Sequence, residues 1–230
     1  MLNIIDNLTS LFYPKLCAGC LNALQQNENL LCLDCLMHLP ETNYHKEADN
    51  ELKLIFAGRV PVQEVATLLF YKKGNRVQKI LHHLKYKGVK ELGFLLGDYY
   101  GNKLIEETRF QDIDLIIPIP LHPNKLKQRG YNQSEWIAKG LSSGMGKPYN
   151  TNILIRSQYT ETQTRKSRFN RWENVKSVFE IQNGNLIEGK HILLCDDVLT
   201  TGATTEAAIQ QLIEFKDVKV SVVTLATAHN

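Results

Sequence analysis

The sequence predicts an α/β domain with a largely parallel sheet, preceded by a small cysteine-rich module. From about residue 56 onward, short apolar runs alternate with amphipathic helices, which is the pattern of strand–helix–strand units. Four of the five cysteines fall between Cys17 and Cys35, outside that pattern. We therefore expect the module and a linker at residues 1–55 and the α/β domain at residues 56–230.

The strands are predicted by apolar runs that stop at turn residues or charges. Residues 65–71 (VATLLFY) end before Lys72, Lys73 and Gly74. Residues 114–120 (DLIIPIP) and 190–195 (KHILLC) are apolar enough to be buried strands, and the second ends at two aspartates. Further strands are expected at residues 153–155, 178–181 and 218–225.

The helices are predicted by apolar residues that recur every three or four positions. Residues 75–86 and 91–107 have this pattern, and further helices are expected at residues 132–141 and 203–215. Gly93, Gly97 and Gly101 fall on one side of the second helix, which predicts close packing on the sheet. The polar stretch 41–51 (ETNYHKEADNE) has no apolar period and is interpreted as the linker.

Composition excludes several classes of protein. The 230 residues are 43% hydrophobic and 22% charged, which is unlike a disordered or fibrous chain. The net charge of +3 is too small to imply a nucleic-acid partner by itself. No apolar run approaches the roughly 18 residues of a membrane span, and residues 1–14 lack the basic start of a signal peptide. We expect a cytoplasmic protein without a membrane span.

The cysteine spacing predicts a metal site. Cys17-x-x-Cys20 and Cys32-x-x-Cys35 form two knuckles that can supply four thiolates to one tetrahedral ion. Zinc suits four sulfur ligands, and a site with four protein ligands is structural. An iron–sulfur cluster, two redox pairs and unrelated core cysteines are the alternatives. The fifth cysteine, Cys195, ends an apolar strand and is interpreted as a small buried hydrophobe.

The segment 192–204 (ILLCDDVLTTGAT) predicts a ligand site. An apolar strand delivers two carboxylates, and a turn rich in threonine and glycine leads into a helix. A helix start with exposed N–H groups binds phosphate, whereas paired carboxylates suit sugar hydroxyls or Mg²⁺. A ribose 5-phosphate has both kinds of group. The alternative is an exposed turn with a good helix cap.

Three basic stretches are candidate anion sites. Lys125, Lys127 and Arg129 lie in a predicted loop after residues 114–120, and residues 165–171 hold four cations without an acid. Residues 65–90 also lack acids, and there Lys79, Lys85 and Lys87 are candidates for contact with single-stranded nucleic acid. Each stretch has the alternative interpretation of a solvated surface.

The sequence CDDVLTTGAT resembles the motif with which type I phosphoribosyltransferases bind 5-phosphoribosyl-1-pyrophosphate (PRPP). The resemblance implies that Asp196 and Asp197 contact the ribose hydroxyls. It further implies that the 5-phosphate is wrapped by the turn and helix start, namely Thr200, Thr201, Gly202, Ala203 and Thr204.

Two more segments, 118–134 and 162–179, and the cysteine module resemble the ComF/GntX family, in which a zinc ribbon precedes a phosphoribosyltransferase-like domain. Lys166 and Ser177 depart from the pattern expected for that family. The resemblance implies a pyrophosphate loop at Lys125, Lys127 and Arg129. It also implies a closing hood in which Arg168 stabilises the departing charge.

Two functions follow from the resemblance. The first is a Mg²⁺-dependent phosphoribosyltransferase-like protein that binds PRPP and is associated with competence, DNA uptake or DNA utilisation. The second is a non-catalytic competence factor that handles single-stranded DNA and retains the site as a PRPP or phosphate sensor. Single-stranded DNA and a competence helicase are the implied macromolecular partners, and the acceptor of the phosphoribosyl group is not specified.

Overall fold

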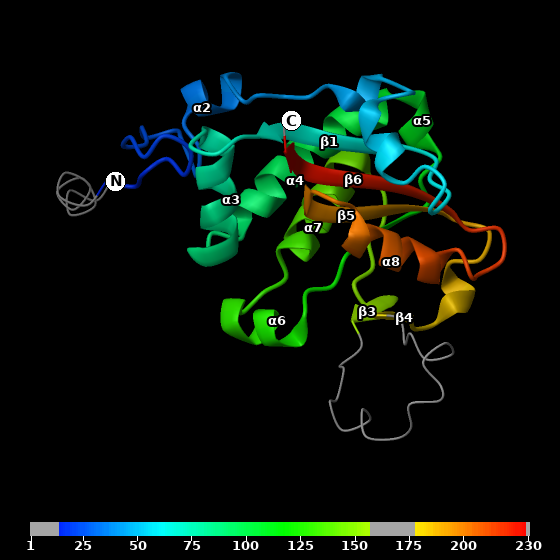
Figure 1. The fold of residues 1–230 in the computed structure, drawn as a ribbon. Coiled ribbons are helices and arrows are strands. Elements are labelled where there is room, and N and C mark those ends of the chain that lie inside the picture. Colours follow the sequence, from blue (N-terminus) through cyan, green and yellow to red (C-terminus); the bar gives the residue numbers. More distant parts are fainter. Residues whose placement is uncertain (1–13, 157–177, 229–230) are drawn as a thin grey trace.

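The computed structural model describes residues 14–156 and 178–228. Among these residues, a four-stranded parallel sheet forms the centre, with strand order β1-β6-β5-β2 (Figure 1). The predicted α/β class with a mostly parallel sheet is therefore confirmed. The strands of this sheet are β1 (Val65–Tyr71), β2 (Leu115–Pro118), β5 (His191–Leu199) and β6 (Lys219–Ala228). The short strands β3 (Leu154–Arg156) and β4 (Phe179–Ile181) pair with each other, antiparallel, in a separate sheet.

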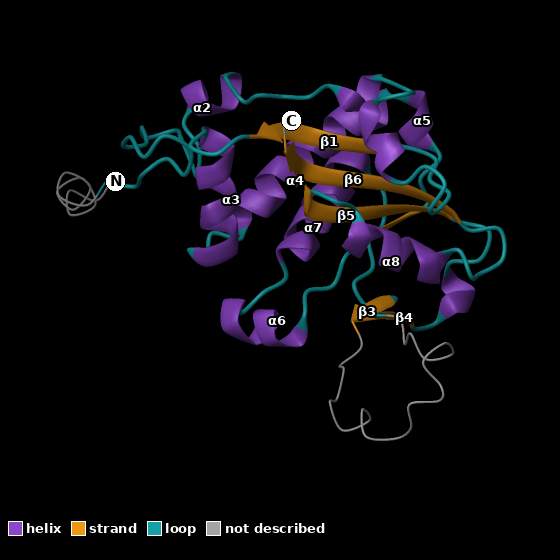
Figure 2. Cartoon of the chain, viewed as in Figure 1, coloured by secondary structure: helices purple, strands orange, loops and turns teal. Residues whose placement is uncertain are grey.

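Helices cover both faces of the central sheet (Figure 2). One face is covered by α3 (Arg76–Tyr86), α4 (Glu91–Glu106) and α7 (Gln133–Met145), and the other by α8 (Ala203–Leu212). The remaining helices are short: α2 (Leu33–Met37), α5 (Thr108–Gln111) and α6 (Pro123–Arg129), with 3₁₀ turns η1 (Tyr44–Lys46), η2 (Glu51–Ile55) and η4 (Gly184–Leu186). No helix in the described part of the chain is long and apolar enough to cross a membrane.

Successive side chains of each strand point to opposite faces of the sheet, and the core is therefore divided into two clusters. On β5, Leu193 and Cys195 pack with the helices α3, α4 and α7, whereas Ile192 and Leu194 pack with α8. Successive side chains of a strand point to opposite faces, so a strand that is apolar at every position must be covered on both. Cys195 is fully buried, as predicted for a small core residue.

The aligned glycines of α4 pack on α7, and not on the sheet as predicted. A Cβ on Gly97 would lie 2.5 Å from the carbonyl oxygen of Ile137, and a Cβ on Gly140 would lie 2.2 Å from that of Phe94. Such contacts are impossible for a real side chain, so the two backbones approach this closely because both helices carry glycine at the crossing. The crossing fixes α7 on the sheet, and α7 begins at the candidate site.

The polar stretch 41–51 is not a free linker, which corrects that interpretation. Thr42 donates its backbone N–H to the Leu68 carbonyl at 3.0 Å, and its hydroxyl donates to the Thr67 carbonyl at 2.5 Å. The Asn50 side chain donates to the Val65 carbonyl at 2.8 Å, and His45 is buried. Because β1 is an edge strand, its backbone groups need partners, and polar side chains supply them. The division of the chain at residue 55 stays a prediction.

The topology places one ligand crevice at the carboxyl ends of β2 and β5. These strands are neighbours, yet the chain leaves β2 toward α7 on one face and leaves β5 toward α8 on the other. The crevice between two connections that diverge in this way is where open α/β sheets bind ligands.

Candidate functional site

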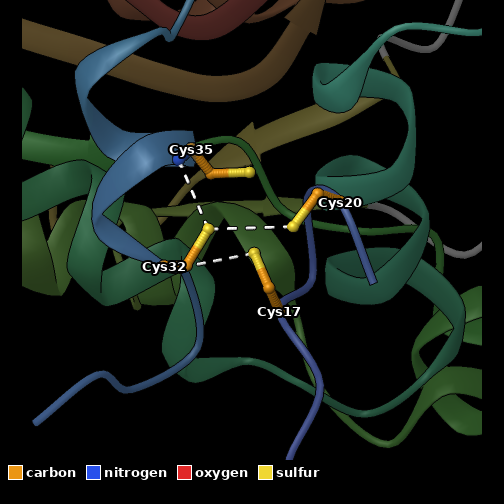
Figure 3. Close-up of side chains that lie close together, drawn as sticks. All are labelled: Cys17, Cys20, Cys32 and Cys35. Carbon is orange, nitrogen blue, oxygen red and sulfur yellow. Dashed lines mark hydrogen bonds between the residues drawn. The ribbon is translucent and has the colours of Figure 1, made fainter. Parts of the chain in front are cut away.

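The four clustered cysteines converge on one point. Cys17 and Cys20 come from a loop, and Cys32 and Cys35 from the start of α2 (Figure 3). All four sulfur atoms lie within 4.8 Å of one another, and the sulfurs of Cys20 and Cys32 are 3.7 Å apart. A tetrahedral ion with Zn–S bonds of about 2.3 Å separates its sulfurs by about 3.8 Å. The cluster is therefore compatible with a single structural zinc ion.

Backbone N–H groups around the cluster favour the thiolate form of Cys17. Burial would raise the pKa of Cys17, but N–H groups of Cys20, Cys32 and Gly19 lower that pKa to about 6. Two of these contacts measure 3.4 Å from the Gly19 nitrogen and 3.3 Å from the Cys32 nitrogen. Burial raises the pKa of Cys35, which also faces the other three sulfurs. A cation among the four sulfurs would favour the thiolate form of each of them.

The two aspartates of the ligand segment lie within β5, which extends further than the strand predicted to end in them. β5 continues to Leu199, and Asp196 pairs in register with Thr224 of β6. The strand continues because β6 extends equally far and supplies backbone partners. Both carboxylates are consequently held by a regular element, which positions them more rigidly than a loop would.

Asp196 is held by α7. Its Oδ1 accepts hydrogen bonds from the Ser134 hydroxyl at 2.7 Å and from the Asp197 backbone N–H at 2.8 Å. Burial and the neighbouring Asp197 charge raise the pKa of Asp196 to about 7, although these hydrogen bonds oppose the shift. The pair thus favours a ligand that brings a positive charge or hydroxyl donors.

Asp197 makes an ion pair with Lys85. The Lys85 Nζ lies 2.9 Å from Asp197 Oδ1, and the Asp197 side chain is only 7% exposed. Its second oxygen, Oδ2, is buried without a hydrogen-bond partner among the described residues. An unpaired buried carboxylate oxygen is costly, so this atom is a strong acceptor for a ligand hydroxyl or a metal ion.

The turn after β5 leads into α8 as the sequence predicts. Gly202 has φ of +75°, which favours glycine, and it caps α8 without any side-chain hydrogen bond. The first N–H groups of the helix therefore remain suited to an anion. Thr200, Thr201, Ala203 and Thr204 are exposed, and Gly202 is buried.

The predicted basic loop after β2 contains a helix, α6, which corrects that expectation. His122 caps its start, Pro123 occupies its first position, and Gly130 ends it in the left-handed conformation. These signals define a helix even though none of its residues is buried. Lys125 and Arg129 lie one turn apart on α6, and Lys127 lies between them.

A cavity of about 200 Å³ joins these parts. Two carboxylates and four cations line it, together with Thr204 and the chain after β2: Asp196, Asp197, Lys85, Lys125, Arg129, Arg156, Thr204, Tyr86, Gln133, Ile119, Pro120 and Leu121. The excess of cations suits an anionic ligand, and the carboxylates suit its hydroxyls. Of the predicted turn residues only Thr204 lines this cavity, and Lys127 does not.

The other predicted residues lie elsewhere. Lys79 and Lys87 are exposed on and just after α3, apart from the cavity, whereas Lys85 lines it. Arg168 and the rest of residues 157–177, with Lys166 and Ser177, lie outside the described residues. Sequence reasoning missed Arg156, which ends β3 and whose burial lowers its pKa. An arginine that ends a three-residue strand leaves no signal that could have identified it.

Comparison with known proteins shows the family to which the chain belongs. A family model described as a phosphoribosyl transferase domain matches residues 134–230. Competence protein F of Haemophilus influenzae is 33% identical over 202 residues, which are 84% of this chain and 88% of that protein. The chain belongs to the ComF/GntX family. The matched domain includes α7, β5, α8 and β6, and hence both aspartates.

Other relatives in the ComF/GntX family carry related names. DNA utilization protein YhgH of Escherichia coli (strain K12) is 27% identical over 201 residues, covering 86% of this chain and 83% of the relative. Competence protein ComFC of Bacillus subtilis is 30% identical over 147 residues, covering 63% and 56%. The names associate this phosphoribosyltransferase-like family with competence and DNA utilisation.

The raised pKa of Asp196 predicts a pH-dependent stability. Between about pH 4 and pH 7 the folded chain holds a proton that the unfolded chain has released, so stability falls as pH rises through this range. Between pH 5 and pH 8 the free energy of unfolding of the wild type should fall by an amount on the order of 2–4 kcal/mol, measured by urea unfolding. Asp196→Asn should lack this fall. Replacement of the exposed Asp49 by asparagine is the control and should preserve the fall. If the unfolding free energy of the wild type rose with pH relative to that of Asp196→Asn, the raised pKa of Asp196 would be contradicted.

Proposed function

We propose that this chain binds PRPP together with Mg²⁺ and acts as a phosphoribosyltransferase. The observation that carries the proposal is the single cavity that brings the aspartate pair, the start of α8 and the cations of α6 together. PRPP carries a diol, a 5-phosphate and a pyrophosphate, and each of these groups has a matching partner there. No other arrangement among the described residues combines the three kinds of partner.

The residues divide the ligand by chemistry. Asp196 and Asp197 would accept the ribose hydroxyls, and the unpartnered Asp197 Oδ2 supports that role. The N-terminal N–H groups of α8, with Thr200, Thr201 and Thr204, would hold the 5-phosphate. Lys125 and Arg129 would hold the pyrophosphate, and the exposed Lys127 of the same helix lies outside the cavity lining. Mg²⁺ would neutralise the diphosphate and reach the carboxylates.

The chemistry that this arrangement supports is displacement of pyrophosphate from C1 of the ribose by a nucleophile. The bond from C1 to the pyrophosphate oxygen breaks, and the bond from the nucleophile to C1 forms. Cations around the leaving group stabilise the charge that develops on it, and the carboxylates orient the sugar. We include Arg168 in the group of stabilising cations as an expectation from the family resemblance.

For the cysteine cluster we propose a bound zinc ion with a structural role. Four protein sulfurs fill a tetrahedral shell and leave no open position for substrate. The module around the cluster is small, so metal binding would supply much of its folding free energy.

A second candidate function, contact with single-stranded DNA, is favoured by the names of the relatives and by the exposed surface of α3. Lys79, Lys87 and His82 are exposed there, and Tyr86 is 67% exposed. Cations that track phosphates beside a ring that stacks on bases are typical of such sites. In this alternative the chain handles DNA and senses PRPP without turnover.

The PRPP proposal is tested by calorimetric titration with and without Mg²⁺. Wild-type protein should bind PRPP saturably in Mg²⁺, and Asp197→Asn should weaken binding by about tenfold or more, because the diol loses a charged acceptor. Asp49→Asn should bind as the wild type does. Pyrophosphate release is then measured with a panel of nucleobases and with single-stranded DNA as acceptors. Tight binding without release would favour the sensor, and no binding would refute the proposal.

Metal analysis tests the cysteine cluster. We expect about one zinc per chain, as four protein ligands require. Cys35→Ala should lose the metal and lower the melting temperature, whereas Cys195→Ala should keep the metal because that thiol is not one of the four clustered sulfurs. Stoichiometric iron, or full zinc content in Cys35→Ala, would contradict the assignment.

DNA contact is tested through its salt dependence. Replacing Lys79 and Lys87 with alanine should weaken binding to single-stranded DNA and reduce the salt slope by about 1.4, because each phosphate contact releases about 0.7 counterion. Fluorescence anisotropy at several salt concentrations measures both. The matched control replaces the exposed lysines 46 and 139. An unchanged slope in the α3 variant would exclude this face.

A further inference from the structure

The ion pair between Lys85 and Asp197 stands at the border of two cavities. The Lys85 side chain, 23% exposed, reaches from the last turn of α3 across to β5. It lines the cavity that holds the aspartate pair, and it also lines a second cavity of about 280 Å³. Lys85 and the rest of α3 lie outside residues 134–230, which match the phosphoribosyl transferase domain model. Lys85 therefore brings a charge to the site from another part of the chain.

The lining of the second cavity contains three cations and suits an anion. Lys85, Tyr86, Gly88, Lys125, Gln128 and Arg129 line it, and no acidic residue of the described chain is among them. Four of these residues also line the cavity with the aspartate pair, so the two spaces share a wall. The Arg129 guanidinium lies 5.4 Å from the Tyr86 ring centre and its side chain bonds to Gln133, which hold it in place. Among the residues that the structure describes, Lys85 has only its ion pair with Asp197.

Lys85 and the proposed ligand compete for Asp197. The Lys85 ammonium occupies Oδ1 at 2.9 Å, and it is a compact charge on a flexible stem that can rotate between partners. Removing it from a buried carboxylate is costly unless another anion receives it. A phosphate group in the second cavity would be such an anion, beside Lys125 and Arg129. Ribose 5-phosphate carries only a hydroxyl at C1 and would offer Lys85 no such anion.

We propose that Lys85 couples the two cavities and thereby selects for ligands that carry a diphosphate at C1. In the free protein Lys85 holds Asp197, and when a diphosphate enters the second cavity Lys85 turns to it and releases Asp197 to the ribose hydroxyls. Lys85 is thus a specificity-determining residue of the site, and not a nucleic-acid contact. This inference rests on the proposed PRPP site.

The test compares the affinities for PRPP and for ribose 5-phosphate by calorimetry at fixed Mg²⁺. The wild type should prefer PRPP by about 100-fold or more, and Lys85→Met should reduce that preference by about tenfold or more, as loss of a charged contact predicts. Lys85→Arg retains the charge and should retain most of the preference. Lys103→Met is the matched control, because Lys103 makes a 2.9 Å ion pair with Glu41 at similar exposure, away from both cavities.

The outcomes separate this inference from the function on which it rests. If the wild type binds no PRPP, both fail. If the wild type binds PRPP but Lys85→Met keeps the wild-type preference, only the role of Lys85 is overturned. Lys85→Gln, which keeps a donor for Asp197 without the charge, replaces Lys85→Met if that variant does not fold, and an unchanged preference there has the same meaning. Equal losses in Lys85→Met and Lys103→Met would also overturn the proposal.

Discussion

The parallel pairing of β2 with β5 is the constraint on which the site depends. The chain leaves the two strands on opposite faces of the sheet, so their carboxyl ends border an open crevice. Two carboxylates of β5 line this crevice, and the segment after β2 contributes the cations of α6. The start of α8 adds a helix terminus on the third side. Acidic and basic groups that are about 70 residues apart in sequence thus meet because two strands are neighbours.

The enclosed position of the two carboxylates determines which partners they need. Asp196 and Asp197 are adjacent in a strand, where two buried charges of the same sign would be unstable alone. Ser134 donates to one, and Lys85 pairs with the other. The pair remains short of partners, since Asp197 Oδ2 has none among the described residues. A site that is incompletely satisfied in this way favours a ligand that completes it.

Much of this could be predicted from the sequence, because the decisive signals were local. The apolar run before Asp196 indicated a buried strand, and the threonine–glycine turn indicated a helix start at Ala203. The cysteine spacing similarly indicated a single cluster. Features that depend on tertiary contact could not be predicted. α6 has caps but no buried residue, the polar stretch 41–51 packs only because β1 is an edge strand, and Lys85 differs from Lys79 only in the side of the helix from which it projects.

Helix α3 connects the cysteine cluster with the aspartate pair. α3 carries Lys85 in its last turn, and its first residue, Arg76, forms a 2.9 Å ion pair with Asp34 of α2 and also donates to the Asp34 carbonyl. Cys17, Cys35 and Leu31 share one core with Val77 and Leu81 of α3. The cysteine cluster therefore braces the start of the helix whose end faces Asp197. Packing of the cluster on α3 therefore helps to place the backbone from which the flexible Lys85 side chain reaches the aspartates.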